Sequence, residues 1–265
     1  MLQKNLTNVF WQALETRNKT GGFVLEIKVD LHTHTSVSQH AYSTVKENAG
    51  SAAENGLEAF AITDHAPGVF DGANEWHFSC LRLVPRTVCG VTVLRGAECS
   101  FTDEDAGIDL VDRVLDMLDV VIASVHTLAY CPQTAEEHTN MLLKAMENPR
   151  IDILGHVDRV KCGADFDLIA KTAKEKGKLI EMNNHSINYS GAEKTIGYTR
   201  ALAEACKKYN TPVVVTSDAH FCDAVGKFDA MLKLFEEIGI DENMVMNTSL
   251  EKFIDYMKDK KNIIL

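Results

Sequence analysis

Short β-prone runs alternate with helical patterns along most of this chain, and this alternation constrains the fold more than any other feature. Strands that are separated by helices form βαβ units, and such strands pair in parallel. About seven such units in one domain predict an α/β fold whose sheet closes into a barrel rather than staying open. The expected strands are Lys28–Leu31, Ala59–Thr63, Val91–Ala97, Val120–Val125, Ile151–Leu154, Leu179–Met182 and Val213–Thr216.

Helical patterns fill the intervals between the strands and lie at both ends of the chain. Apolar spacing along Asn5–Asn18 predicts an amphipathic helix, so we expect residues 1–27 to form a helical extension before a barrel domain of residues 28–265. The exposed side of that helix leaves association into a homo-oligomer open. Thr248 or Ser249 is expected to cap the last helix. The other expected helices are Val45–Asn55, Asp109–Leu118, Ala135–Glu147, Leu168–Lys176, Thr195–Tyr209 and Ala224–Ile238.

The charge balance narrows the classes of partner. The net charge is −11, which argues against binding to nucleic acid or to an anionic membrane. A phosphate substrate is still compatible, because bound metal cations reverse the potential at a site. The seven cysteines include no C-x-x-C pair, so we expect a reducing, cytoplasmic compartment. We find no signal segment and no apolar run near ~18 residues, which indicates neither export nor a membrane span.

Nearly every expected strand is followed by a histidine or a carboxylate. His32 and His34 alternate after the first strand, so both imidazoles are expected on one face. The carboxyl ends of parallel barrel strands converge on one face, where active sites are built. One zinc uses about four ligands, so this set implies two or three ions, and its mixture of nitrogen and oxygen suits zinc, manganese or iron. The candidate ligands are His32, His34, His40, His65, Glu98, His126, His156, Asp218 and His220.

Seven segments, in this order, resemble the PHP (polymerase and histidinol phosphatase) superfamily, and most closely its YcdX-like phosphatases. The resemblance leaves residues 1–27 unmatched and implies a PHP fold, a distorted (βα)7 TIM-like barrel, over residues 28–265. The matching segments are Asp30–His34, His40–Ser43, Ala61–His65, Arg95–Glu98, Ile122–His126, Gly155–His156 and Ser217–His220.

The resemblance also implies a site of three metal ions, most simply zinc. The first ion would take His32, His34, Glu98 and Asp218. The second would share Glu98 and take His126 and His156, and the third would take His40, His65 and His220. A hydroxide bridging the first two ions would be the nucleophile, and the third ion would help to bind phosphate.

Several further residues have two interpretations each. Asp64 either orients a ligand imidazole, as the resemblance implies, or caps a loop. Arg159 either contacts the substrate phosphate or pairs with surface acids. Two histidines either contact the substrate or make contacts within their own loops. They are His77, in the loop Gly68–Phe78, and His185, after the sixth strand. His138 is expected on the surface of a helix.

Clustered cations of this kind suit the hydrolysis of phosphate esters. We therefore expect a metal-dependent phosphatase that acts on a small phosphomonoester. The chain has no G-x-S-x-G or P-loop motif that would supply a different mechanism. The alternatives with the same site are a histidinol-phosphate phosphatase, a nucleotide 3′-phosphoesterase and a nuclease, the last disfavoured by the acidic charge. The non-enzymatic alternative is a structural metal-binding PHP module, which the complete ligand set disfavours.

Overall fold

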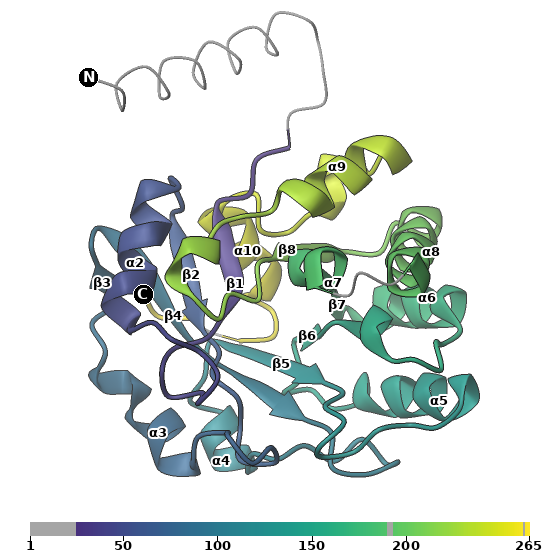
Figure 1. Ribbon diagram of the computed structural model, residues 1–265, viewed down its shortest axis with the longest axis horizontal. Coiled ribbons are helices and arrows are strands. Elements are labelled where there is room, and N and C mark those ends of the chain that lie inside the picture. Colours follow the sequence, from purple (N-terminus) through teal and green to yellow (C-terminus); the bar gives the residue numbers. More distant parts are fainter. Residues whose placement is uncertain (1–24, 190–192, 262) are drawn as a thin grey trace, which may run out of the picture.

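The computed structural model describes residues 25–189, 193–261 and 263–265. They form a parallel sheet in the order β1-β2-β4-β5-β6-β7-β8, with the short β3 antiparallel to β4 (Figure 1). This architecture confirms the predicted barrel of seven parallel strands, whereas the expected helix at Asn5–Asn18 lies outside the described residues. The strands are β1 (Val29–Thr33), β2 (Ala59–Ile62), β3 (Thr87–Val88), β4 (Val91–Ser100), β5 (Val120–Ser124), β6 (Ile153–Leu154), β7 (Leu179–Asn183) and β8 (Val213–Thr216).

The barrel closes between β8 and β1 with help from a side chain. A parallel bridge joins Thr33 to Ala219 at the carboxyl ends of the two strands. Nearer the amino ends, Asn247 is fully buried and takes the place of ladder hydrogen bonds. Its Oδ1 accepts from the backbone N–H of Val215, and its Nδ2 donates to the carbonyl oxygens of Val29 and Val215. Asn247 therefore joins two strands that do not pair directly at this level.

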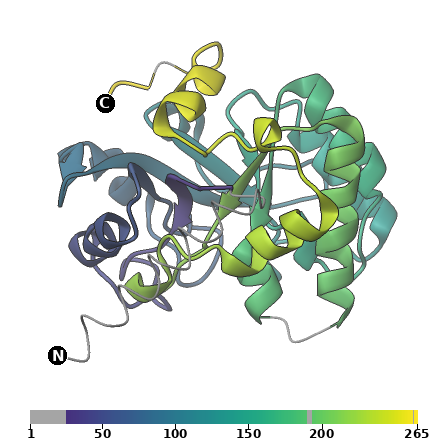
Figure 2. The same ribbon diagram turned by 90° about the horizontal axis from the view of Figure 1, so that it is seen from above.

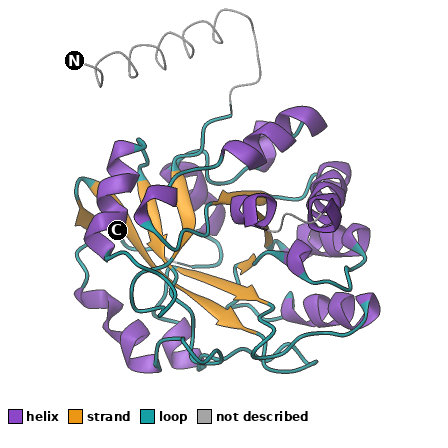
Figure 3. Ribbon diagram, in the orientation of Figure 1, coloured by secondary structure: helices purple, strands orange, loops and turns teal. Residues whose placement is uncertain are grey.

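The helices surround the strands, as Figure 3 shows by colour. Ser249 caps the last helix by accepting from the backbone N–H of Lys252, as the sequence predicted. No described helix is both long and apolar enough to cross a membrane. The helices are α2 (Val45–Glu54), α3 (Glu75–Cys80), α4 (Asp112–Leu115), α5 (Ala135–Ala145), α6 (Phe166–Lys176), α7 (Asn184–Tyr189), α8 (Glu193–Tyr209), α9 (Asp229–Ile238) and α10 (Leu250–Met257).

Some expected helices differ in extent, and tertiary contacts explain why. The expected helix Asp109–Leu118 shortens to α4, because the carboxylate of Asp109 accepts from the distant backbone N–H groups of Gly68 and Ser100. The expected helix from Ala224 begins only at Asp229, since Gly226 has a φ of +75°. The six-residue helices α3 and α7 were not predicted, because so short a segment shows little periodicity.

The expectation for His138 was wrong. Its side chain is fully buried beneath α5, and its Nδ1 lies 2.9 Å from the carbonyl oxygen of Gly163. Since a carbonyl oxygen only accepts, Nδ1 carries the proton and donates it. The histidine therefore ties α5 to the loop before α6.

Apolar side chains fill the barrel at the amino ends of its strands. Val29, Ala59, Val120 and Leu179 are the first residues of four strands, and all of them belong to the interior cluster. Phe253 of α10 joins this cluster and is fully buried. Figure 2 shows α10, in yellow, at one end of the sheet. This helix seals the bottom of the barrel and leaves the carboxyl ends of the strands for polar side chains.

Candidate metal centre

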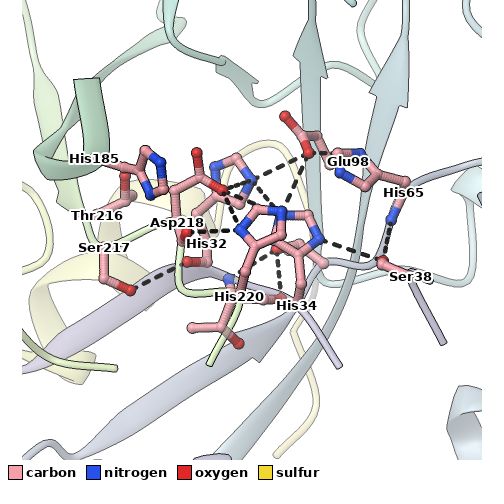
Figure 4. Close-up of polar contacts among 12 residues, drawn as sticks. His32, His34, Ser38, His65, Glu98, His185, Thr216, Ser217, Asp218 and His220 are labelled. Atoms are coloured by element: carbon pink, nitrogen blue, oxygen red, sulfur yellow. Dashed lines mark hydrogen bonds and ion pairs between the residues drawn. The ribbon is translucent and has the colours of Figure 1, made fainter. Parts of the chain in front are cut away.

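Histidines and carboxylates from the carboxyl ends of the strands meet at one face of the barrel. His32 lies in β1 and Glu98 in β4, while Asp218 follows β8. Figure 4 shows Glu98 and Asp218 among the imidazoles of this face. The structure thus brings all nine candidate ligands into one cluster, the other six being His34, His40, His65, His126, His156 and His220.

A first group of ligand atoms lies between His32, His34, Glu98 and Asp218. The Oε2 of Glu98 lies 3.3 Å from Nε2 of His32 and 3.5 Å from Nε2 of His34. The Oδ1 of Asp218 lies 3.5 Å and 3.2 Å from the same two nitrogens. Two nitrogens and two oxygens that face a common space form a ligand set suited to one tetrahedral ion.

The other oxygen of Glu98 faces a second group of imidazoles. Its Oε1 lies 3.3 Å from Nε2 of His126 and 2.9 Å from Nε2 of His156. The Nδ1 of His65 approaches Oε2 at 2.9 Å. Glu98 therefore contacts both groups, which is the geometry of a carboxylate that bridges two ions.

A third group lies toward the solvent. The Nε2 atoms of His40 and His220 are 2.8 Å apart, and the ring of His40 stacks on that of His65 with centroids 5.1 Å apart. Ligand atoms of His34, His65 and His220 also lie within 4.8 Å of one another. His34 therefore borders the first and the third group, which the sequence did not indicate.

Five of these imidazoles have Nδ1 against an oxygen atom and Nε2 toward the cluster. The oxygen partners are Glu181 for His32, Ser38 for His34, Asp71 for His40, Ser100 for His126 and the backbone carbonyl of Asp218 for His220. A neutral imidazole that keeps its proton on Nδ1 presents a lone pair at Nε2, which is the form that binds metal. Glu98 Oε2 and His156 Nδ1 are buried, and neither makes a hydrogen bond within the part of the chain that the structure describes, although imidazole nitrogens lie close to Oε2. The donor set therefore fits metal ions.

Glu181 of β7 contacts the cluster and was not among the residues predicted from the sequence. Its side chain is fully buried, and its Oε1 accepts from Nδ1 of His32 at 2.6 Å and from the hydroxyl of Thr216 at 2.7 Å. Its Oε2 accepts from the backbone N–H of His156 at 2.6 Å. The signal was present, because an acid within the apolar run Leu179–Met182 is rarely buried unless it is paired.

The ionisable groups perturb one another strongly. Burial lowers the pKa of His34 to about 3, which keeps its imidazole neutral. Burial also disfavours charge on Glu98, but His32, His126 and His65 outweigh it and hold the Glu98 pKa well below its usual value. The pKa of Asp218 is likewise held well below normal, because His32 and Arg159 outweigh its burial. Both acids are therefore carboxylates at neutral pH.

The backbone is strained at two of these positions. His156 and Asp218 have φ values of +25° and +54°, in a region that residues other than glycine rarely adopt. Gly155, which precedes His156, has no room for a side chain, since a Cβ there would lie 2.1 Å from Oγ of Ser124. The backbone is therefore strained at the positions from which the side chains of His156 and Asp218 reach the cluster.

Asp64 and His77 lie beside the cluster. The carboxylate of Asp64 accepts from the backbone N–H of Thr35 and from the hydroxyl of Ser38, which in turn contacts Nδ1 of His34. Asp64 therefore caps the loop after β1 and reaches a ligand imidazole only through Ser38. His77 lies in α3 with its Nε2 3.4 Å from Asp64, and it is not among the residues that line the cavity at the cluster.

A cavity of about 890 Å³ opens at the cluster. Arg159 and His185 both line it. A nitrogen of the Arg159 guanidinium lies 2.9 Å from Oδ2 of Asp218, so this arginine faces the cluster instead of pairing with surface acids. Burial lowers the pKa of His185, and its ring centroid lies 6.1 Å from that of His220.

Comparison with known proteins gives one consistent assignment. The PHP domain matches residues 30–187. A "probable phosphatase" of Acetivibrio thermocellus is 41% identical over 241 residues, which covers 91% of this chain and 99% of that protein. Another "probable phosphatase", from Caldanaerobacter subterraneus subsp. tengcongensis, is 39% identical over 247 residues, with coverages of 92% and 96%.

Among solved structures, a histidinol phosphate phosphatase of Lactococcus lactis in complex with zinc, L-histidinol and phosphate has the same fold. The TM-score is 0.59 at 20% identity, with 81% of this chain and 94% of that chain covered.

Proposed function

Because the chain belongs to the PHP domain family, we propose that it is a metal-dependent phosphatase that hydrolyses a small phosphomonoester. The observation that carries the proposal is the position of Glu98, whose two oxygens face different groups of imidazoles. Such an arrangement suits neighbouring cations, and neighbouring cations promote phosphate-ester hydrolysis. The curated relatives named as phosphatases support the same activity.

The distances between ligand atoms support the following assignment, which is the one that the family resemblance implies. His32, His34, Glu98 and Asp218 would hold one ion, and Glu98, His126 and His156 would hold a second. His40, His65 and His220 would hold the third, since Nε2 of His40 contacts Nε2 of His220 and ligand atoms of His65 and His220 lie within 4.8 Å. Zinc is the preferred metal, with manganese or iron as alternatives, because the set is rich in imidazole nitrogen with two carboxylates.

When bound, the ions would lower the pKa of a coordinated water and offset charge on the phosphoryl oxygens. The chain's own residues supply the rest. Glu181 fixes the ring of His32 and the backbone at His156, so both ligands are preorganised. Arg159, held by Asp218 at the cavity wall, is placed to donate hydrogen bonds to phosphate oxygens. A cavity of this volume is large enough to hold a small phosphate ester.

The test combines metal analysis with phosphate release from a panel of esters. We expect about three zinc ions per chain and hydrolysis of small phosphomonoesters, with both lost together in Glu98→Gln. Loss of one bridging oxygen ligand should lower metal affinity by more than the roughly 10- to 100-fold cost of losing an outer partner. The matched control is Glu175→Gln on the exposed face of α6. Metal retention without turnover of any ester would contradict the proposal and favour a structural metal-binding module.

A further inference from the structure

The cavity has two chemically different walls. One wall is the metal-ligand cluster with Arg159, and the other part of the lining comes from the loops after β2, β5 and β6. We call the latter the apolar wall, because most of it is aliphatic or aromatic. Its apolar residues are Val69, Phe70, Val125, Leu128, Pro132 and Val160.

All the acids among the described residues that line the cavity belong to the cluster wall. They are Asp71, Glu98 and Asp218. Asp71 binds His40, and the other two carboxylates lie among the imidazoles. Glu137 lies close to the apolar wall, but its carboxylate accepts from the backbone N–H of Gln133 and does not line the cavity. The ionisable residue that the described part of the apolar wall contributes to the lining is a base, Lys161.

Two residues of the apolar wall are far more exposed than their chemistry favours. The side chains of Phe70 and Leu128 are 80% and 66% exposed, respectively. Exposed apolar side chains that gather at a cavity mouth mark a surface that binds an apolar group. Burying that surface against a ligand is favourable at about 25 cal/mol per Å² of apolar area.

From this contrast we infer that the esterified alcohol of the substrate is apolar and carries no positive charge. The inference rests on the proposed phosphatase function and names its substrate class. With the phosphate at the cluster wall beside Arg159, as the proposed function has it, the alcohol would extend along the rest of the lining, which includes Val125, Leu128 and Phe70. An ammonium group that packs against this surface would lose part of its hydration and meet no carboxylate of the described apolar wall, which costs free energy. Amino alcohol phosphates such as histidinol phosphate are therefore poor substrates.

The test uses two esters of the same shape, para-ethylbenzyl phosphate and para-(aminomethyl)benzyl phosphate, with the zinc-loaded full chain. We expect kcat/KM to be about tenfold or more higher for the ethyl ester, since 1.4 kcal/mol corresponds to a factor of ten. Equal or better hydrolysis of the aminomethyl ester would overturn the inference while leaving the phosphatase function intact. Hydrolysis of neither ester, or of any other in the panel, would count against the phosphatase function itself.

Substitution of Leu128 supplies a charge-specific control. Leu128→Asp places a carboxylate at the exposed rim, and Leu128→Asn is nearly the same size without the charge. We expect the Asp variant to lower the ratio of kcat/KM for the ethyl ester to that for the aminomethyl ester. The Asn variant should leave this ratio nearly unchanged. Dissociation constants of the matching benzylphosphonates, measured by calorimetry, give a readout that does not depend on turnover. A preference that is the same in both variants, or that is absent in phosphonate binding, would overturn the inference.

Discussion

The two ends of the barrel are built on opposite principles. At the amino ends of the strands, apolar residues and Phe253 form a closed interior. At the carboxyl ends, the same strands carry buried acids, imidazoles and two residues with positive φ. β7 makes the change within two residues, since Leu179 belongs to the apolar interior and Glu181 binds His32. Stability and chemistry thus occupy different ends of one sheet.

This difference predicts that substitutions at the two ends of the barrel affect different properties, which experiments can test. Substitutions at the amino ends should change the free energy of unfolding and leave metal affinity unchanged. Substitutions at the carboxyl ends should do the reverse. A substitution at the amino ends that changes metal affinity, or one at the carboxyl ends that changes the free energy of unfolding of the metal-free protein, would show that the two ends are coupled.

The largest effect is expected for Phe253→Ala in α10. The change removes a fully buried ring from the sealed end of the barrel, so the free energy of unfolding should fall by about 3–5 kcal/mol. Denaturant unfolding at fixed zinc concentration measures the change. Leu83→Ala, at a side chain that is 74% exposed, is the control and should cost about 0.5 kcal/mol or less. Weakened zinc binding in folded Phe253→Ala would show coupling between the ends.

A smaller loss of stability is expected for Asn247→Ala. This change leaves the backbone groups of Val29 and Val215 without their partner at the seam between β8 and β1. Unpaired buried polar groups make a cost of about 2–3 kcal/mol reasonable. Hydrogen exchange should show faster opening of β1 and β8 than of β5. The exposed Asn243→Ala is the matched control, and equal stability of the two variants would refute the role of Asn247.

At the carboxyl ends, Glu181→Gln should weaken zinc binding by about 10- to 100-fold. The amide keeps the shape of the side chain but removes the charge that holds the Nδ1 proton of His32. Competition with a chelator of known affinity measures the change, and the free energy of unfolding of the metal-free protein separates it from a folding defect. Zinc affinity equal to that of the wild type would remove Glu181 from the site.

The smallest effect concerns His138, which lies outside both ends. Burial lowers the pKa of His138, so the unfolded chain takes up a proton on this residue before the folded chain does. The stability that the neutral ring contributes is present above its unfolded pKa of about 6.5 and is lost as the pH falls toward the lower folded value. The stability of the wild type relative to His138→Gln should therefore decrease in acid. Parallel stability curves from about pH 7.5 to about pH 5.5 would contradict this.

The candidate metal ligands could be predicted from the sequence, whereas the residues that hydrogen-bond to their imidazole rings could not. His126 and His156 each follow an apolar β-prone run, so their position could be predicted from local pattern. The roles of Ser100, at the end of β4, and of the loop residue Asp71 could not be predicted, because nothing in the neighbouring sequence indicates which imidazole each of them contacts. His138 was misplaced for the same reason, since its partner Gly163 is 25 residues away.

What the sequence by itself determined is the face of the barrel at which the chemistry lies. A period of strand and helix sets the topology, and parallel strands bring their carboxyl ends together whatever the details of packing. Only the tertiary structure decided which nitrogen of each ring faces the cluster, that His34 borders two groups, and that one wall of the cavity is apolar. Those properties depend on contacts between residues far apart in the chain, such as His32 with Glu181, which no local sequence pattern specifies.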